Sequence, residues 1–389
     1  MSEWKQKSLA EITTKVTDGA HHSPSEHKGG LPMFSVKDMR ENGFYYCDAK
    51  TISEEEFNKL ISSGCQPEID DILIAKDGSV LKHIFRVKEK PDYVLLSSIA
   101  IVRPDKNVIN PSFLVYAIKE PSTKDLILTN FVGGSGVPRI VLKDFKQIEL
   151  PIPDKKTQTA ISSVLSSLDD KIDLLHRQNA TLEKMAETLF RQWFVEEAKE
   201  EWETLPLSGI ANFLNGLACQ KFPPKNEIEK LPVLKIKELS SGITENSDWA
   251  TSEVKQEYIV KNGDVIFAWS ASLMVKLWDG QDCILNQHLF KVTSEDFPKW
   301  FYYLWCKYHL AEFISIAASH ATTMGHIKRG DLDEAKVFVP SPNEMQEMTE
   351  IVEPLIEKII KNSNQIRTLT ALRDTLLPKL MNGEVRVNI

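Results

Sequence analysis

Two segments of the chain carry apolar residues at a seven-residue spacing. Within 154–196, apolar side chains recur at every seventh position, and further apolar residues widen the stripe: Ile161, Leu168, Leu175, Leu182 and Leu189, with Val164, Leu165, Ile172, Met185 and Trp193 beside them. A pattern kept over about four heptads is typical of a long coiled-coil helix. At 1.5 Å per residue, this helix would be on the order of 60 Å long.

The segment 343–376 repeats the same spacing. Its apolar positions are Met348, Leu355, Leu369 and Leu376, with Asn362 in the remaining slot. Ser341 and Glu344 form a capping box at its start, and Pro342 suits the first helical position. We expect Pro354 to kink this helix and Pro378 to end it.

Two stripes of this length bury each other best as an antiparallel coiled coil. The alternative is that each helix packs on its own globular domain. The rest of the chain mixes short apolar runs with glycine-rich turns, which favours α+β domains. We expect strands at Asp71–Ala75, Ile99–Arg103, Val233–Ile236 and Asp264–Ala268, and helices at Phe113–Lys119 and Trp300–Ile316.

The chain contains a long internal repeat. Four short matches occur in the same order in both halves, with an offset that drifts from about 200 to about 187 residues, as deletions in the second copy would produce. The matching segments are Trp4–Ile12 with Trp202–Ile210, Leu31–Met39 with Leu231–Leu239, Asp71–Ala75 with Asp264–Ala268, and Leu150–Pro153 with Val339–Pro342. The sequence therefore predicts two similar α+β domains joined by two long helices in an antiparallel coiled coil, with pseudo-two-fold symmetry. The expected boundaries are 1–150 and 201–340 for the domains, and 151–200 and 341–389 for the helices.

Composition narrows the class of protein. The 389 residues carry a formal net charge of -8, with 42% hydrophobic and 26% charged residues. This balance is that of a folded globular protein and argues against a uniformly basic DNA-coating protein. Five scattered cysteines without a CxxC pair fit a reduced cytoplasmic setting. No leader segment is expected at the start, and Lys307, His309 and Glu312 make a membrane span at Trp300–Ala318 improbable.

Enzyme motifs are missing from the sequence. It has no Walker motif, no nucleophile elbow, and neither the cofactor loop nor the Asn/Asp-Pro-Pro-aromatic motif of an amino methyltransferase. Asp248 with Glu253-Val254-Lys255 imitates a nuclease site only by chance. His21, His22 and His27 crowd one loop, but nothing nearby completes a set of metal ligands. We expect no catalytic residue, metal or cofactor in this chain.

The ends of both helices carry the most informative strings. The first helix closes with Leu189-Phe190-Arg191-Gln192-Trp193-Phe194, and the second with the segment Leu369–Val385. A Pro-x-Pro pair stands where each helix begins, and a glutamine follows it within the first turns, at Pro151, Pro153 and Gln158 and again at Pro340, Pro342 and Gln346. Over the whole chain, this pattern resembles the specificity subunit of type I restriction–modification enzymes.

The resemblance implies a role in DNA recognition. Each globular part would be a target-recognition domain that binds one half of a split, double-stranded DNA sequence. The helices would set the distance between the halves and dock two modification (methyltransferase) subunits. Those subunits would carry S-adenosylmethionine, and a restriction subunit using ATP and Mg could join them. The specificity subunit itself would be non-catalytic, and the two unequal domains would give an asymmetric target.

Two glycine-containing basic segments are candidates for DNA contact. In 133–146, Arg139 can pair with guanine, Ser135 offers a hydroxyl, and Lys143 suits a phosphate. The second copy, 319–329, has no acidic residue and offers further hydroxyl, imidazole and cationic groups: His320, Thr322, Thr323, His326, Lys328 and Arg329. The alternative is that each segment is a solvated turn before the last strand of its domain.

The segments after two expected strands are further candidates. Lys76, Lys82 and Arg86 follow Asp71–Ala75, whereas Trp269 and Ser270 follow the corresponding Asp264–Ala268. A difference of this kind is what two readers of different DNA sequences require, although a solvated face is equally compatible with it.

The string Asn286-Gln287-His288 can bind adenine edges through its amides, or it can form a buried amide network. A different class of function also stays open at this point, namely a coiled-coil adaptor that bridges two protein partners without binding DNA. Protection of one specific duplex would separate the two functions.

Overall fold

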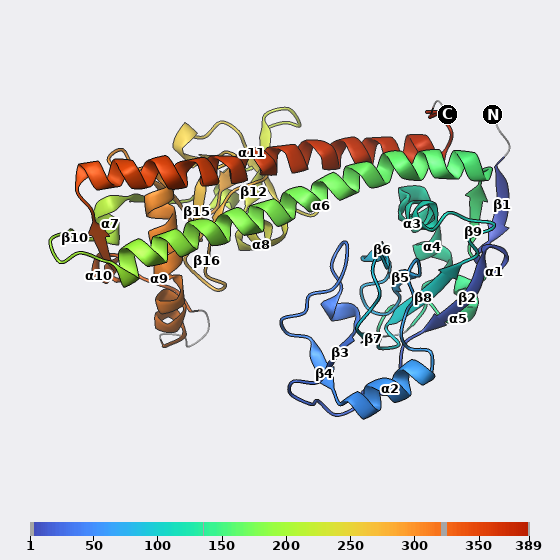
Figure 1. Cartoon of the computed structure of the whole chain (residues 1–389). Coiled ribbons are helices and arrows are strands. Elements are labelled where there is room, and N and C mark those ends of the chain that lie inside the picture. The colour runs from blue at the N-terminus through green and yellow to red at the C-terminus, as the bar shows by residue number, and fades with distance from the viewer. Residues whose placement is uncertain (1–3, 135, 320–324, 388–389) are drawn as a thin grey trace. The chain divides into compact units, whose positions relative to one another are not determined.

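The computed structural model describes residues 4–134, 136–319 and 325–387. It divides into two compact units. Unit 1 comprises Met1–Asp173 and Leu369–Ile389, and unit 2 comprises Leu174–Thr368. Both long helices contribute residues to both units (Figure 1).

Unit 1 is built on a four-stranded antiparallel sheet in the order β2-β8-β5-β6, with a three-stranded sheet in the order β4-β3-β7 and the pair β1-β9. Short helices complete it. The elements of the first unit are β1 (Lys5–Ser8), α1 (Leu9–Ile12), β2 (Thr13–Asp18), β3 (Leu31–Phe34), η1 (Val36–Asp38), β4 (Lys50–Ile52), α2 (Glu54–Ser62), β5 (Ile72–Ala75), β6 (Ile84–Arg86), β7 (Val94–Leu95), β8 (Ile99–Pro104), α3 (Pro111–Lys119), α4 (Pro121–Phe131), α5 (Leu142–Phe145) and β9 (Glu149–Ile152).

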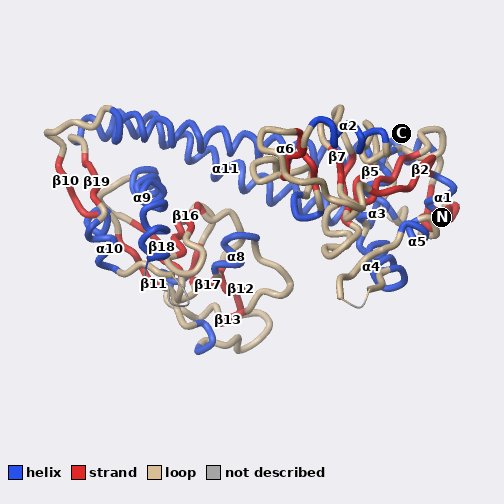
Figure 2. Tube along the Cα trace, turned by 90° about the horizontal axis from the view of Figure 1, so that it is seen from below, coloured by secondary structure: helices blue, strands red, loops and turns tan. Residues whose placement is uncertain are grey.

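Unit 2 has the corresponding sheet order β11-β18-β15-β16, with a second sheet β13-β12-β17-β14 and the pair β10-β19 (Figure 2). Its elements are β10 (Glu203–Pro206), α7 (Leu207–Ile210), β11 (Asn212–Asn215), η3 (Cys219–Lys221), β12 (Lys230–Leu234), α8 (Ile236–Ser241), β13 (Trp249–Thr251), η4 (Gln256–Tyr258), β14 (Ile259–Val260), β15 (Val265–Ala268), β16 (Met274–Leu277), β17 (Cys283–Leu285), β18 (Leu289–Thr293), α9 (Lys299–Ser319), α10 (Arg329–Glu334) and β19 (Lys336–Val339).

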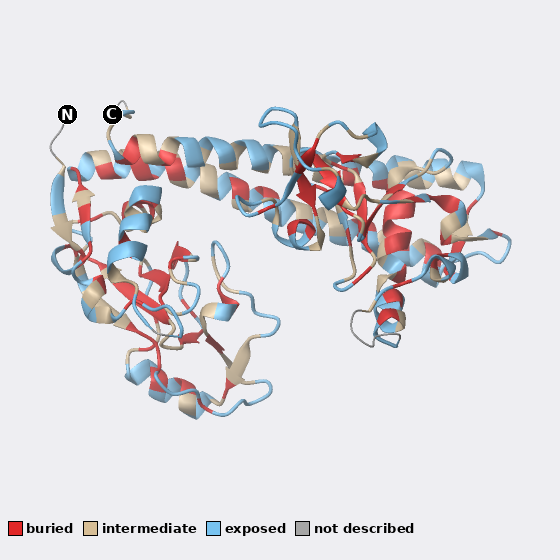
Figure 3. Cartoon of the chain, turned by 180° about the vertical axis from the view of Figure 1, so that it is seen from behind, coloured by how far each residue is buried: buried red, intermediate tan, exposed pale blue. Residues whose placement is uncertain are grey.

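The shared strand order shows that the sequence repeat is a structural repeat. The two central strands, β5 and β15, are buried along their whole length (Figure 3). Each is continuously apolar because both of its faces pack against core side chains. The predicted α+β class is confirmed in each unit.

The two long helices are α6 (Lys155–Arg191) and α11 (Pro342–Met381), and a short π-helix, η2 (Gln192–Glu196), follows α6. Within unit 2, Asn179 contacts Asn362, and Lys199 and Trp202, which follow η2, contact Glu344. Residue numbers therefore rise along one helix as they fall along the other, so the pair is antiparallel. In unit 1, Arg373 of α11 lies 2.9 Å from Asp169 of α6.

The expected end of the second helix at Pro378 is wrong. The helix α11 passes through Pro354 and Pro378 as one element and ends at Met381. Proline inside a helix removes one backbone hydrogen bond and costs about 3 kcal/mol or more, so packing of the following turn has to offset that cost for the helix to continue. Leu380 and Met381 supply that packing, since both are buried in the core of unit 1. Among the described residues, no helix is long and apolar enough to cross a membrane.

Candidate nucleic-acid interface

The two basic segments of unit 1 lie side by side. Gly78 donates a backbone hydrogen bond of 2.8 Å to Pro138, and Ile140 donates one of 3.0 Å to Lys76. Arg139 lies between these two bonds and forms an isolated bridge with Asp77. Residues 76–78 and 138–140 therefore form one paired loop, which we call the loop pair of unit 1.

Unit 2 contains the same loop pair. Ala271 donates 2.8 Å to the carbonyl of Gly325, and Ile327 donates 3.1 Å to that of Trp269. Ser270 bridges His326 as Asp77 bridges Arg139. Residues 269–271 and 325–327 are the loop pair of unit 2, and Arg139 and His326 hold equivalent positions in the two.

Both loop pairs contain one residue in the left-handed backbone region at the same place. Gly78 has a φ of 70° and Ala271 a φ of 57°. This conformation costs a residue with a Cβ about 1 kcal/mol or more, so alanine there marks a turn that the surrounding structure imposes. In both units this turn directly follows the bridged residue, Asp77 or Ser270.

A polar contact supports the base of each loop pair, and it differs between the units. In unit 1, the Lys76 ammonium lies 3.3 Å from a carboxylate oxygen of Asp18, and both side chains are buried. In unit 2, the Trp269 indole donates a hydrogen bond of 3.1 Å to Asn215 Oδ1. Asp18 and Asn215 end the equivalent strands β2 and β11. A buried ion pair in one unit is thus replaced by a neutral hydrogen bond in the other.

The predicted residues of unit 1 take different roles in this geometry. Arg139 and Lys143 are exposed, and Lys82 is exposed on the loop before β6. Lys76 is committed to Asp18, and Arg86 is half-buried with its guanidinium 3.4 Å from Asp70. The structure therefore offers Arg139, Lys143 and Lys82 to a ligand and uses the other two cations to hold the loops. Ser135 lies outside the described residues.

In unit 2, Trp269, Ser270 and His326 come together at the loop pair. The indole ring of Trp269 lies 6.4 Å from the His326 ring and 5.8 Å from the His288 ring, measured between centroids. Lys328 is exposed just beyond. His320, Thr322 and Thr323 lie outside the described residues.

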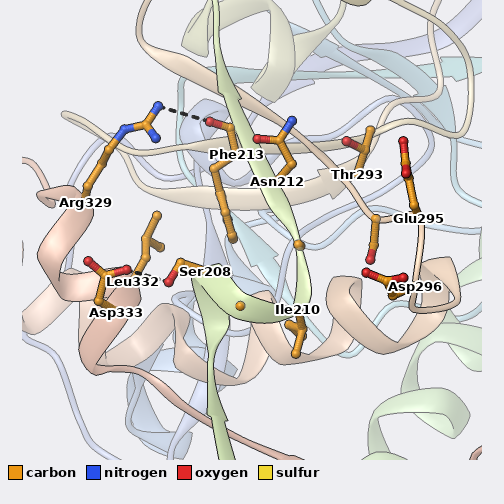
Figure 4. A pocket seen from close by; sticks show the side chains of 13 residues that line it. Ser208, Ile210, Asn212, Phe213, Thr293, Glu295, Asp296, Arg329, Leu332 and Asp333 are labelled. Carbon is orange, nitrogen blue, oxygen red and sulfur yellow. Dashed lines mark hydrogen bonds between the residues drawn. The ribbon is translucent and has the colours of Figure 1, made fainter.

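Arg329 has a structural environment of its own. Its Nη2 donates a hydrogen bond of 3.4 Å to the backbone carbonyl of Phe213, across one end of a 610 Å³ cavity (Figure 4). Asp333, Glu295 and Asp296 also line this cavity. These carboxylates repel a phosphate, so the cavity itself does not suit DNA. Arg329 is exposed, and its hydrogen bond to Phe213 links α10 to β11.

The residues that support the loop pairs were not apparent from the sequence. Asp18 and Asn215 are the last residues of strands β2 and β11, whose composition is unremarkable, and only the three-dimensional repeat shows that they match. Among the described residues, no three His, Cys, Asp or Glu side chains converge to hold a metal ion.

Comparisons with known proteins place the chain in a family. Residues 1–184 and 199–370 match the family model described as the type I restriction modification DNA specificity domain. The chain belongs to this family of type I restriction–modification specificity proteins. The specificity subunit of the type I restriction enzyme MjaIX from Methanocaldococcus jannaschii is 28% identical over 307 residues, which cover 72% of this chain and 71% of the relative.

Other members extend the similarity over the full length. The HindI specificity subunit from Haemophilus influenzae is 21% identical, covering 99% of this chain and 100% of the relative. The crystal structure of a type I restriction–modification S subunit from M. genitalium shares the fold with a TM-score of 0.58 at 16% identity, covering 99% of this chain and 96% of that one. Specificity subunits of this family are thus similar to the chain in sequence, and one of them in fold as well.

Proposed function

We propose that this chain is the DNA specificity subunit of a type I restriction–modification complex, in which each unit binds one half of a bipartite, asymmetric target. The repeated loop pair carries the proposal. The same backbone frame presents Arg139 in unit 1 and His326 in unit 2. One frame with two different side chains is what two half-sites of different sequence require.

The candidate side chains divide by their surroundings. We assign base contacts to Arg139 in unit 1 and to Trp269 and His326 in unit 2, because these lie at the loop pairs and are exposed or half-buried. Ser270 is buried against His288, so its proposed contact depends on the loop pair rather than on an exposed hydroxyl. Lys82, Lys143 and Lys328 are exposed cations suited to phosphates, which fix register without reading sequence. Lys76 and Arg86 are paired with carboxylates of unit 1, whereas Arg329 is exposed and stays a proposed phosphate contact. Ser135, His320, Thr322 and Thr323 stay predicted contacts on the basis of sequence alone.

The helices offer a repeated site for a partner. Aligning Thr181–Phe190 with Thr368–Leu377 pairs Met185 with Leu372, and these apolar side chains are 48% and 45% exposed. Neither belongs to the core of its unit. The same exposed apolar position in both repeats fits two copies of one partner, which we propose to be the methyltransferase subunit.

In this proposal the chain supplies recognition, and its partners supply the chemistry. S-adenosylmethionine would bind the methyltransferase subunits, and ATP and Mg a restriction subunit where one joins. The chain itself would hold none of these and would catalyse no step.

DNA protection by the complex of this chain with its methyltransferase tests the proposal. A footprint on a random duplex library should select one split sequence and leave a gap of fixed length. A complex that forms but protects no specific duplex would favour the adaptor function. Cleavage of plasmid with magnesium by the chain alone would contradict a non-catalytic role.

A further inference from the structure

The string Asn286-Gln287-His288 lies directly beside the loop pair of unit 2. Trp269 donates a backbone hydrogen bond of 3.4 Å to the carbonyl of His288, and Gln287 donates one of 2.8 Å to that of Leu217. Unit 1 has Ser97 at the matching place, where its backbone donates 2.9 Å to Ala20. The backbone hydrogen bond is thus present in both units, while the side chain is glutamine in unit 2 and serine in unit 1.

The two amides of this string have opposite environments. Asn286 is only 7% exposed, and its Oδ1 accepts a hydrogen bond of 3.4 Å from the backbone of His288. It belongs to the interior. Gln287 is half-buried, and its neighbour His288 is exposed. Of the two amides, Gln287 is therefore the one available to a ligand.

A chain of hydrogen bonds fixes how Gln287 presents its amide. Ser270 Oγ lies 3.2 Å from His288 Nδ1, and His288 Nε2 lies 3.4 Å from Gln287 Nε2. An amide nitrogen can only donate, so His288 accepts at Nε2 and carries its proton on Nδ1, which donates to Ser270. One amide N–H of Gln287 is thereby used, while its second N–H and its carbonyl oxygen remain.

That remaining donor and acceptor match one base edge. In the major groove, adenine offers N7 as an acceptor and the N6 amino group as a donor, and glutamine pairs with both at once. The groups around Gln287 in the loop pair are uncharged or weakly basic: Trp269, Ser270 and His326. Guanine, by contrast, is read best by a cation, which this position lacks.

We propose that Gln287 is a specificity-determining residue that pairs with an adenine in the second half-site. The proposal rests on the proposed function, because it assumes that unit 2 binds DNA. Ser97 is too short to make the same bidentate contact, so no equivalent adenine contact is expected from this position of unit 1.

The test uses the complex of the full chain with its methyltransferase, in the source cell and on synthetic duplexes. Gln287→Ala should leave the first half-site unchanged and make one adenine position of the second half-site degenerate, with about 10- to 100-fold less discrimination. Gln287→Glu should shift that position toward cytosine, because a carboxylate accepts from the cytosine amino group. Ser97→Ala is the matched control and should leave the second half-site unchanged.

The outcomes separate this proposal from the proposed function. If the parent complex methylates a split sequence and both Gln287 variants keep its second half, Gln287 reads no base. Loss of all DNA binding by variants whose unfolding curves match the parent would also overturn the proposal, because a base contact governs selectivity more than total affinity. If the alanine variant does not fold, Gln287→Ser takes its place with the side chain of unit 1. A parent complex with no split sequence would instead contradict the proposed function.

Discussion

Arg139 and Gly133 exchange two backbone hydrogen bonds, of 2.8 and 2.9 Å, so these two residues are held directly opposite each other. The neighbours of Arg139, Pro138 and Ile140, are hydrogen-bonded to Gly78 and Lys76 in the loop after β5. Arg139 is exposed, while its backbone and those of its neighbours are hydrogen-bonded to Gly133 on one side and to residues 76–78 on the other. A fixed backbone below a free side chain lowers the entropy lost when that side chain binds.

We expect Arg139→Ala to relax the choice of base at one position of the first half-site. If Arg139 pairs with guanine through both of its donors, about 1–3 kcal/mol of discrimination should be lost. Arg139→Lys is the control, because it keeps the charge but not the fork geometry. Competition among duplexes that differ at each first-half position measures the effect, and unchanged selectivity in Arg139→Ala would exclude base reading.

The buried pair between Lys76 and Asp18 should matter for folding. Lys76→Met leaves the Asp18 carboxylate buried with its main cationic partner removed, at a cost of about 3 kcal/mol. The double variant Asp18→Asn with Lys76→Met removes both charges and should regain most of that loss. Urea unfolding, followed by hydrogen exchange in β2 and β5, measures both. Equal stability of the single variant and the parent would show that the pair contributes little.

Substitutions of Asn179 in α6 and Asn362 in α11 should have non-additive effects on stability, because the two side chains are hydrogen-bonded to each other. Asn362 is fully buried, and its amide nitrogen donates a hydrogen bond of 2.9 Å to Asn179 Oδ1. Asn179→Leu alone should lower the free energy of unfolding by about 1–3 kcal/mol, because it leaves the buried Asn362 amide with only its long 3.5 Å hydrogen bond to Gln178. Adding Asn362→Leu fills the heptad slot with an apolar residue and should restore stability or exceed that of the parent. A double-mutant cycle by urea unfolding would refute the coupling if the two changes simply added.

Glu344, in the first turn of α11, should make the stability of the protein fall at acidic pH. Hydrogen bonds from Lys199 and Ser341 lower the pKa of Glu344 from its ordinary value to about 2. The ionised Glu344 carboxylate therefore adds to the free energy of unfolding above the unfolded-state pKa of about 4.3, and this stabilisation is lost as the pH falls toward the pKa of the folded state. Glu344→Gln should therefore be less stable at neutral pH and should lose less stability on acidification. Urea unfolding of parent and variant at pH 6, 4 and 3 checks this. The prediction is contradicted if the free energy of unfolding falls with pH equally in both proteins.

The sequence determines some levels of this structure better than others. The apolar stripes predict α6 and α11 because a seven-residue period is a local pattern, and the internal repeat predicts two similar sheets. Pro378 was misleading, since burial of Leu380 is a tertiary effect that outweighs a local rule. The support of Trp269 by Asn215 joins residues 54 positions apart, so no spacing along the chain indicates it.

The same limit applies to the candidate site. The sequence shows where the lysines and arginines are, but whether a lysine can bind a ligand depends on whether residues from other strands bury it or pair with it. Lys76 and Lys82 look alike in the sequence, yet one is buried against Asp18 and the other is exposed.

Genome-wide mapping of methylation in the source cell tests the central claim most directly. The comparison is between the parent chain and a variant with two inserted heptads, one in α6 near Gln178 and one in α11 near Asn362. The account predicts a split, asymmetric methylated sequence that requires this chain. In the double insertion it predicts the same two half-sites with a longer gap, because the insertions lie in α6 and α11 and leave the sheets and both loop pairs untouched. Altered half-sites with an unchanged gap, or a methylation pattern independent of the chain, would contradict it.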